Sequence, residues 1–412
     1  MRILLVSKEG DGLGLAQRLA LEGNAVSAWV REERFHRALS GIVSRVSTYR
    51  ASLRRADLVI TDCVGFGKLG DEFRANGVPF IGASEPIDKI ELDRQVGMDF
   101  FRRAGITIPE TEYHNSAREA LGAKRDFGDG WVIKPCGNKA TALTMVVTDE
   151  ELWEHCLGKV PPGCPLILQR IVKGVEVSTE GWFNGRAFIT PFNHTFEEKR
   201  FLAGNLGCNT GCMGNVVVAR ESNKLTKHTV ERVAPFLKMI GYRGPFDINC
   251  IVNKEGAYAL EATGRMGYDA VEALSELLDE PLGDFLFEVA TGTKAKAPLG
   301  RDSAIAVRLS IPPWPVQKPD GKSHGEPVLG LTDEVLEHVF LTDVYKEGKA
   351  FLTAAGDGVL LKATARSPNL SVAQRKVYKL LDGIKVSSKQ YRNDIGGRVS
   401  DDMAQLQAWG WL

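Results

Sequence analysis

Short apolar runs alternate with amphipathic stretches over residues 1–85 of the chain. After the first run, Leu15–Leu21 has the spacing of a helix. The runs that have the length of buried strands are Ile3–Val6, Ala25–Val30, Leu58–Thr61 and Val78–Ile81. Because alternating strands and helices are typical of parallel sheets, we expect a small parallel-sheet (Rossmann-like) domain here.

A glycine-bearing turn, Gly10-Asp11-Gly12-Leu13-Gly14, follows the first of these strands. Dinucleotide-binding turns carry glycines at this place, but the full fingerprint and its acidic partner are not evident. A plain turn between strand and helix is at least as consistent with the sequence. The turn therefore leaves the ligand of this domain open.

The pattern changes after residue 85. Ile87–Ala104 has helical periodicity and is followed by Gly105 and Pro109, which end helices. Strand-like runs then dominate, at Trp131–Pro135, Ala142–Val147, Leu166–Val172, Val175–Phe183, Arg186–Thr190, Phe246–Val252 and Ala257–Ala262. Further helices are expected at Glu150–Leu157, Leu225–Ile240 and Val372–Ile384. The later part of the chain therefore has the mixture expected of an α+β protein.

Composition excludes several classes of protein. The 412 residues include 52 basic and 52 acidic side chains, so a coat on nucleic acid or on an anionic membrane is not expected. The apolar runs are too short to cross a bilayer. Seven scattered cysteines do not form a disulfide framework, which favours a reducing, cytoplasmic location. Cys208 and Cys212 resemble half a metal site, but no second Cys/His pair has matching spacing, so zinc is not expected.

The stretch Gly207–Gly214 reads G-C-N-T-G-C-M-G. Its glycines permit close approach of backbone N–H groups to a ligand, and neither helical nor strand periodicity explains it. We therefore expect a loop that holds an anion, with Asn209, Thr210 and Gly211 as its catalytic contacts.

Several residues are candidates for binding a nucleotide. Lys134 ends an apolar strand beside a glycine-containing segment that includes Lys139, which suits phosphate binding. A surface lysine beside a turn is the alternative. Gln169 and Arg170 end another strand and suit a purine edge, whereas Glu176 suits ribose hydroxyls. Exposed polar residues on a strand would look the same.

A hairpin carries the candidate metal ligands. Asp247 and Asn249 are two residues apart on one strand and so share a face, and the returning strand brings Glu261 and Thr263 beside them. Oxygen ligands of this kind suit Mg²⁺. Arg265 follows and suits an acyl phosphate or phosphoryl group. The alternative is an exposed hairpin with ordinary polar side chains.

Short motifs along the chain match one family of ligases. They are Phe80-Ile81-Gly82 with Glu91, Ile133-Lys134, Gly174-Val175-Glu176, Lys199-Arg200, Asn209-Thr210-Gly211-Cys212-Met213-Gly214, Leu260-Glu261, Arg265-Met266-Gly267 and Tyr391–Arg398. On these motifs the chain resembles the phosphoribosylamine–glycine ligases of purine biosynthesis, which have the ATP-grasp fold. Arg94 stands where the family usually has a lysine near the ATP phosphates, and Thr263 replaces its metal-binding asparagine.

The resemblance implies roles for further residues. It implies ATP and Mg²⁺ (or Mn²⁺) as cofactors and adds Arg94 to the residues near the phosphates. It also implies substrate contacts, which are Lys199, Arg200, Met213, Gly214 and Asp269.

The resemblance also divides the chain. The expected parts are an N-terminal domain (1–85), a helical segment (86–120), a nucleotide-binding lid (121–190), a metal and substrate subdomain (191–298) and a small C-terminal α+β domain (299–412).

The function implied is ATP-dependent amide formation through an acyl phosphate, joining glycine to phosphoribosylamine. Two alternatives stay open: a related ligase that uses another amine, such as a modified nucleotide, and a nucleotide-binding protein without ligase activity. Small molecules are the expected partners, with no direct nucleic acid and no membrane. We expect a monomer or a homodimer.

Overall fold

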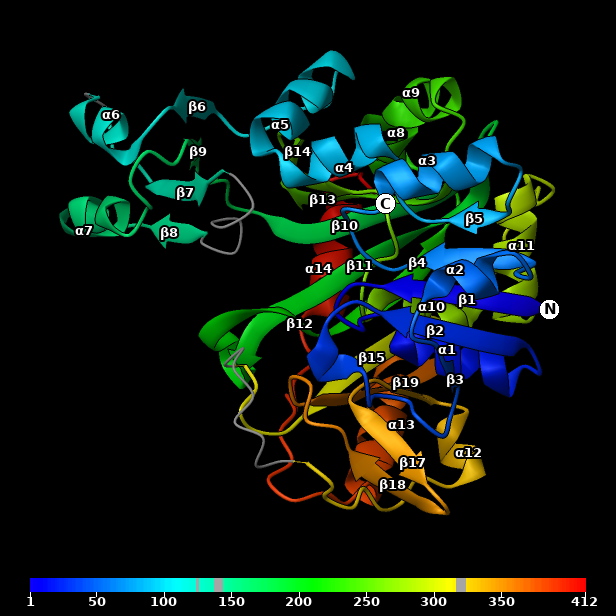
Figure 1. The fold of residues 1–412 in the computed structure, drawn as a ribbon. Coiled ribbons are helices and arrows are strands. Elements are labelled where there is room, and N and C mark those ends of the chain that lie inside the picture. Colours follow the sequence, from blue (N-terminus) through cyan, green and yellow to red (C-terminus); the bar gives the residue numbers. More distant parts are fainter. Residues whose placement is uncertain (124–125, 137–143, 316–323) are drawn as a thin grey trace.

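The structure is a computed structural model that describes residues 1–123, 126–136, 144–315 and 324–412. Its strands form a five-stranded sheet, an eight-stranded sheet, a four-stranded sheet and a two-stranded hairpin. Figure 1 shows the four-stranded sheet set apart at the upper left, away from the rest of the molecule. The predicted combination of α/β and α+β parts is confirmed.

The five-stranded sheet is entirely parallel, as predicted for the N-terminal domain. Its strands, in order across the sheet, are β3 (Ser44–Arg45), β2 (Ala25–Val30), β1 (Arg2–Ser7), β4 (Leu58–Thr61) and β5 (Phe80–Ile81). The helices between them are α1 (Leu13–Leu21), α2 (Tyr49–Leu53) and α3 (Gly67–Ala75). Two of the strands, β2 and β4, have the limits that the apolar runs predict.

The eight-stranded sheet is antiparallel and occupies the middle of the molecule (Figure 1). Its strands are, in order, β14 (Ala257–Thr263), β13 (Arg243–Val252), β10 (Val175–Asn184), β11 (Phe188–Leu202), β12 (Leu206–Arg220), β15 (Ser303–Ser310), β19 (Val359–Ser367) and β16 (Val339–Leu341). The predicted hairpin is present as β13–β14, and the runs predicted at Val175–Phe183 and Arg186–Thr190 belong to a second hairpin, β10–β11. The sheet is continuous across residues 190 and 298, where two domain boundaries were predicted.

The four-stranded sheet has its own small core. Its strands are, in order, β6 (Thr111–His114), β9 (Leu166–Arg170), β7 (Trp131–Pro135) and β8 (Met145–Val147). Trp131 and Leu157 lie at the centre of a separate hydrophobic cluster between this sheet and two helices, α6 (Ala117–Gly122) and α7 (Trp153–Gly158). This part therefore packs around its own buried side chains.

The remaining helices and strands complete the layers around the central sheet. The helices are α4 (Glu85–Leu92), α5 (Arg94–Arg103), α8 (Lys224–His228), α9 (Ala234–Met239), α10 (Ala270–Leu277), α11 (Leu282–Thr291), α12 (Asp333–Leu336), α13 (Leu370–Gly383) and α14 (Val399–Ala408). The two-stranded hairpin consists of β17 (Val344–Glu347) and β18 (Ala350–Thr353).

Two helices predicted as single are each divided. The first is divided at Asp93, whose carboxylate accepts the backbone N–H groups of Gln95 and Val96 and so caps α5. The second is interrupted at Thr229 and continues through a 3-10 helix (Val230–Val233) into α9, where Pro235 lies in the first turn, a position that proline tolerates. Both breaks are local capping effects that apolar periodicity does not detect.

The stretch Gly207–Gly214 is part of strand β12, and the prediction of a loop is wrong. The preceding strand β11 continues to Leu202, and Arg200 pairs with Asn209 across the ladder. The register shifts on both sides of Arg200, and Gly207 has a φ of +79°. Glycine tolerates these irregularities, so the run forms a bent strand end.

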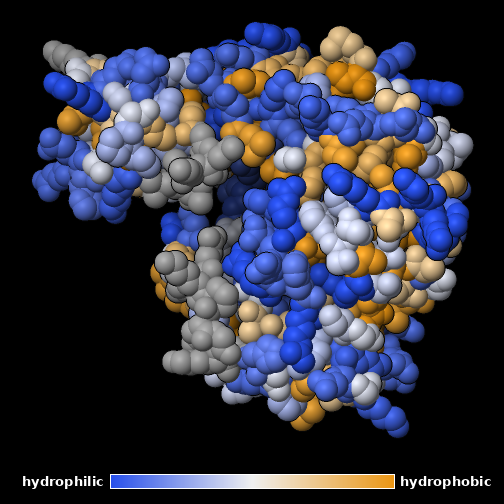
Figure 2. All heavy atoms as spheres, in the orientation of Figure 1, coloured by the Kyte–Doolittle hydropathy of each residue, from blue (hydrophilic) through white to orange (hydrophobic). Residues whose placement is uncertain are grey.

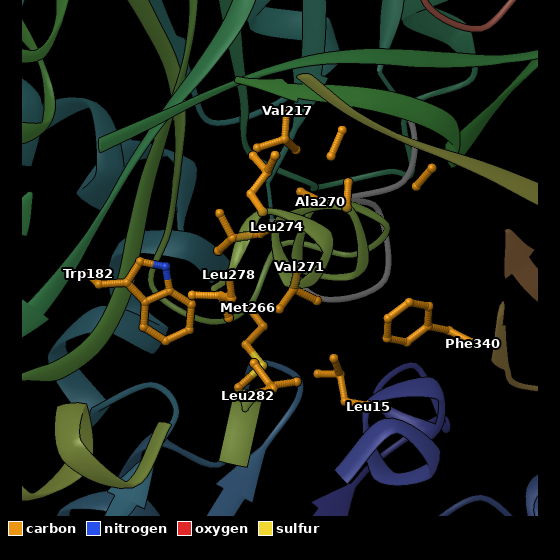
Figure 3. Packing of buried hydrophobic residues seen from close by; sticks show 14 of the residues in the cluster. Leu15, Trp182, Val217, Met266, Ala270, Val271, Leu274, Leu278, Leu282 and Phe340 are labelled. Atoms are coloured by element: carbon orange, nitrogen blue, oxygen red, sulfur yellow. The ribbon is translucent and has the colours of Figure 1, made fainter. Parts of the chain in front are cut away.

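Helix α10 joins the N-terminal domain to the central sheet. Figure 3 shows Leu15 of α1 and Phe340 of β16 on one side of Val271 and Leu274, with Val217 of β12 on the other. All of these side chains are at most 4% exposed. Packing of this kind fixes the N-terminal turns relative to the sheet.

Most of the face shown in Figure 2 is hydrophilic, with a hollow beside the four-stranded sheet. In the part of the chain that the structure describes, no helix combines the length and the apolar character needed to cross a membrane.

Candidate active site

A cavity of about 460 Å³ lies where the N-terminal domain, the central sheet and the C-terminal strands meet. Its lining includes seven residues that the sequence singles out: Lys199, Gly211, Asp247, Asn249, Glu261, Thr263 and Arg265. A second cavity of about 230 Å³ contains Arg94 and Lys134 and shares Glu261 with the first. One carboxylate thus joins the predicted phosphate residues to the rest of the site.

The β13–β14 hairpin places the candidate metal ligands on one face, as predicted. Asp247 pairs with Thr263 across the ladder, and Asn249 pairs with Glu261. The Glu261 side chain is 60% exposed, whereas the Oδ1 atom of Asn249 is buried without a hydrogen-bond partner. Among residues 1–123, 126–136, 144–315 and 324–412, no group of three or more His, Cys, Asp and Glu side chains is arranged to hold a metal.

Two further carboxylates of this region were missed. Glu180 pairs with Asp247 in the sheet, and burial raises the pKa of Glu180 to about 7. Glu197 lies two residues before Lys199 on β11 and also lines the cavity. Burial, together with Glu180 and Glu197, holds the pKa of Asp247 well above its usual range. Even spacing along a strand could have revealed them, since Glu180 lies four residues after Glu176 on β10 and Glu197 lies two before Lys199 on β11.

Lys199, predicted to bind substrate, lies among three carboxylates. Its Nζ atom is 2.9 Å from Glu176, 3.4 Å from Glu197 and 3.9 Å from Glu261. Burial opposes the charged form, but the three carboxylates outweigh it and raise the pKa of Lys199 well above its usual range. Lys199 therefore stays charged and holds the carboxylates near one another.

Lys134 is 8% exposed at the end of β7. Burial lowers its pKa to about 8, although Glu261 partly offsets this effect. Arg94 begins α5, and its Nη2 atom donates to the Thr144 hydroxyl at 3.4 Å. The two predicted phosphate residues therefore flank one small cavity.

Two predicted purine contacts, Gln169 and Arg170, have structural roles. The buried amide of Gln169 donates to the hydroxyl of Thr111 at 3.1 Å. The Arg170 guanidinium lies 4.3 Å from the centre of the Trp131 ring and donates to a carbonyl in the same subdomain. Lys139 lies outside the described residues.

The Gly207–Gly214 stretch contributes two residues, Gly211 and Cys212, to the cavity lining. The Thr210 hydroxyl donates to the backbone carbonyl of Lys199 at 2.9 Å, and Arg200 donates to the carbonyl of Gly207 at 2.8 Å. Asn209 is exposed, whereas Met213 and Gly214 are buried. Most of these contacts therefore hold the strand end in shape.

Arg265 and Asp269 each have a close partner of opposite charge. Arg265 lies 2.9 Å from Glu91, and its pKa is raised: burial opposes this, but Glu91 outweighs it. Asp269 is fully buried and accepts two hydrogen bonds from Arg308, at 2.9 and 3.1 Å. Arg265 lines the cavity, whereas Asp269 is not part of the lining.

The comparisons with known proteins agree with this geometry. No protein-family model matches the chain. A phosphoribosylamine–glycine ligase of Mycobacterium leprae is 27% identical over 346 residues, which cover 80% of this chain and 79% of that protein. The structure of a phosphoribosylamine–glycine ligase from Thermotoga maritima has a TM-score of 0.77 at 21% identity, covering 96% of this chain and 100% of that one.

The chain is a homologue of the phosphoribosylamine–glycine ligases. The ATP-grasp fold expected from the sequence is also confirmed by more distant structures. One is the biotin carboxylase domain of 2-oxoglutarate carboxylase from Hydrogenobacter thermophilus, solved with MgADP, with a TM-score of 0.64 at 13% identity. It covers 94% of this chain and 91% of that one.

In this ATP-grasp homologue, the sequence missed the residues at the other end of the larger cavity. They are Lys8, Glu9, Asp11, Arg34, Arg308, Asp357 and Lys362. They come from two turns, a short 3-10 helix (Glu33–Phe35) and two strands that are far apart in the chain, and no motif links them. These charged residues line the part of the cavity for which the sequence predicts no side chain.

Proposed function

We propose that the chain is an ATP-dependent carboxylate–amine ligase that forms an amide through an acyl phosphate. The observation that carries this proposal is the register of β13 and β14. It places Asn249 and Glu261 on one face, at the junction of the two cavities. Glycine and phosphoribosylamine are the substrates that the names of the relatives indicate.

The residues of the smaller cavity suit the ATP phosphates. Lys134 and Arg94 supply positive charge there. Glu176 suits the ribose, because its contacts with Lys199 and Asn249 both use Oε1 and leave Oε2 for hydroxyl groups. We assign no contact with ATP to the Arg170 side chain, since it is engaged within its own subdomain. The Gln169 amide nitrogen is engaged as well, but its Oε1 atom is buried without a hydrogen-bond partner, so Gln169 stays a candidate for contact with the adenine.

The chemistry of the hairpin fits Mg²⁺. Its donors are all oxygen atoms, and the buried, unpartnered Oδ1 of Asn249 lies beside the carboxylate of Glu261 in the ladder. Glu261 and Asn249 would hold the ion, with Asp247 and Thr263 next to them. Phosphate oxygens and water would complete the shell, as is common for Mg²⁺. Bound there, the ion would neutralise negative charge on the ATP phosphates.

The reaction has two steps. An oxygen of the carboxylate substrate attacks the γ-phosphorus, and ADP leaves. The amine nitrogen then attacks the acyl carbon, the C–N bond forms, and inorganic phosphate leaves. Arg265, held by Glu91, and the backbone of Gly211 would stabilise the charge on the acyl phosphate.

An ADP-release assay with glycine and freshly generated phosphoribosylamine tests the proposal. We expect ADP to form only when Mg²⁺ and both substrates are present. Turnover with another amine but not with phosphoribosylamine would replace the acceptor and keep the ligase. Absence of any carboxylate-dependent ADP release would instead support a nucleotide-binding protein without ligase activity.

A further inference from the structure

Glycine-bearing turns around the larger cavity resemble anion sites. Free backbone N–H groups in such turns commonly bind phosphate. Here carboxylates of the chain itself accept them: Asp62 from Gly12 at 2.7 Å, Asp88 from Gly65 and Gly67 at 3.0 and 2.6 Å, and Asp343 from Gly356 and Gly358 at 2.8 and 2.9 Å. These N–H groups are therefore already engaged.

Four of the cations that line this cavity are also engaged with carboxylates. The pairs are Lys8 with Glu9 at 2.8 Å, Arg265 with Glu91 at 2.9 Å, Arg308 with Asp269 at 2.9 Å and Lys362 with Glu272 at 2.9 Å. Their charge is thus largely balanced within the protein. An acceptor that binds here meets little unbalanced positive charge from them.

Two carboxylates in the same lining differ from these pairs. Within the described residues, neither Asp11 nor Asp357 has an ion pair within 4 Å. Lys362 donates to the backbone carbonyl of Asp11 at 3.3 Å, not to its carboxylate. One oxygen of Asp357 accepts the N–H of Val359 at 2.8 Å. Burial raises the pKa of both carboxyl groups, although Arg308 opposes that rise in each.

An independent observation indicates a polar ligand in this place. Thr342 lines the same cavity and is 6% exposed, and its hydroxyl is buried without a hydrogen-bond partner. The hydroxyl of Tyr268, another lining residue, is also buried without a hydrogen-bond partner. Buried polar atoms without partners are rare in folded proteins, so both are expected to meet a ligand or water.

We propose that Asp11 and Asp357 receive the amine substrate as an ammonium ion, and that Asp11 is the base that takes its proton. This inference rests on the ligase function proposed for the same site. The ammonium nitrogen gives one proton to the Asp11 carboxylate, and its lone pair then attacks the acyl carbon. The C–N bond forms, the bond between the acyl carbon and the phosphate oxygen breaks, and inorganic phosphate leaves with the second proton from the nitrogen.

The protonation of Asp11 depends on groups from every element around it. Facing it are Glu9, Asp62, Cys63, Arg265, Tyr268, Arg308, Asp357 and Lys362. The cations among them favour the carboxylate, whereas burial and the neighbouring acids favour the protonated form. The rate of amide formation should therefore fall on the acid side, as Asp11 becomes protonated.

The test separates activation of the carboxylate from transfer to the amine. Hydroxylamine traps an acyl phosphate as a hydroxamate and needs no ammonium site. With ATP, Mg²⁺ and glycine, we expect wild type, Asp11→Asn and Asp357→Asn to form hydroxamate within about twofold of each other. With freshly generated phosphoribosylamine, kcat/KM should fall by about 100-fold or more in Asp11→Asn, the scale of general-base catalysis. Its acid limb should disappear from the pH profile, and Asp357→Asn should mainly raise KM for the amine.

Asp401→Asn, at an exposed aspartate of α14, is the matched control and should leave both reactions unchanged. Amide formation within threefold of wild type in Asp11→Asn would overturn the inference, and so would an equal loss of hydroxamate and amide. If wild type forms hydroxamate but no amide with phosphoribosylamine, the variants are compared on a panel of primary amines read by mass spectrometry. Failure of every amine then overturns the inference. Absence of hydroxamate in wild type would instead refute the proposed ligase function.

Discussion

At the ATP end of the cavity, three carboxylates share one lysine. At the end that contains Asp11 and Asp357, here called the acceptor end, two cations, Arg308 and Lys362, lie within 4 Å of two carboxylates, Asp269 and Glu272. Lys199 lies within 4 Å of Glu176, Glu197 and Glu261. Arg308 instead forms a two-point contact with the buried Asp269. Lys199 therefore has more carboxylates around it than its single charge neutralises.

The comparison indicates where a bound cation is expected, namely beside carboxylates that no cation of the chain neutralises. At the ATP end the surplus lies beside the unpartnered amide oxygen of Asn249, which suits a hard metal ion. At the acceptor end, the lining carboxylates of the described residues without an ion pair are Asp11 and Asp357. The side chains near them supply hydroxyl groups. The same residue type thus fits a metal at one end and an ammonium group at the other.

The largest effect is expected on removal of Glu261, the carboxylate that lines both cavities. We expect Glu261→Ala to lower Mg²⁺-dependent hydroxamate formation by more than about 100-fold, because a metal at ATP phosphates supplies several kcal/mol. The melting temperature should hardly change, since the side chain is 60% exposed. Glu255→Ala, on the turn of the same hairpin, is the control and should keep full activity. Activity that survives in Glu261→Ala would show that the metal assignment is wrong.

A second variant tests whether the turns at the acceptor end are held by their own carboxylates. Asp343 accepts backbone N–H groups from Gly356, Asp357 and Gly358. In Asp343→Ala these donors lose their partner, so the free energy of unfolding should fall by about 3 kcal/mol in urea titrations. Glu347→Ala, at an exposed site of β17, should change it by less than about 0.5 kcal/mol. Equal stability of the two variants would contradict the structural role of Asp343.

The sequence predicts well those parts of this comparison that depend on local pattern. Alternating runs located β2 and β4, and the spacing of Asp247, Asn249 and Glu261 correctly predicted that these side chains share one face of the hairpin. Period-two alternation survives in the fold because one face of each strand must be buried.

The rest depends on contacts between distant segments. Glu180 reaches Asp247 only because β10 pairs with β13. Asp11 and Asp357 come from opposite ends of the chain, and no local spacing links them. The stretch Gly207–Gly214 is extended because β11 is long enough to pair with it, which its own composition does not reveal.

Two glycines of Gly207–Gly214 allow a packing role to be separated from a catalytic role. A Cβ atom at Gly214 would lie 2.6 Å from the carbonyl oxygen of Ala306, whereas one at Gly211 would meet nothing within 4 Å. Gly214→Ala should therefore lower the free energy of unfolding by about 2 kcal/mol, and Gly211→Ala by less than about 1 kcal/mol. Thermal melts check the stability, and the hydroxamate assay then shows whether a methyl group at residue 211 blocks the acyl phosphate. A similar loss of stability in both variants would contradict the packing around Gly214.

The last prediction concerns the charge of Lys134 at the ATP end. Burial lowers its pKa to about 8 in the folded protein, whereas the unfolded chain keeps the proton up to about pH 10.5. Stability should therefore rise as the pH increases from 8 to 10.5, and this rise should vanish in Lys134→Met. ATP binding should change in the opposite direction, because a neutral lysine must take up a proton to pair with phosphate. Titration calorimetry should show the dissociation constant for ATP rising about tenfold between pH 7 and 9 in wild type and staying level in Lys134→Arg. A wild-type constant that does not change over this range would place Lys134 away from the phosphates.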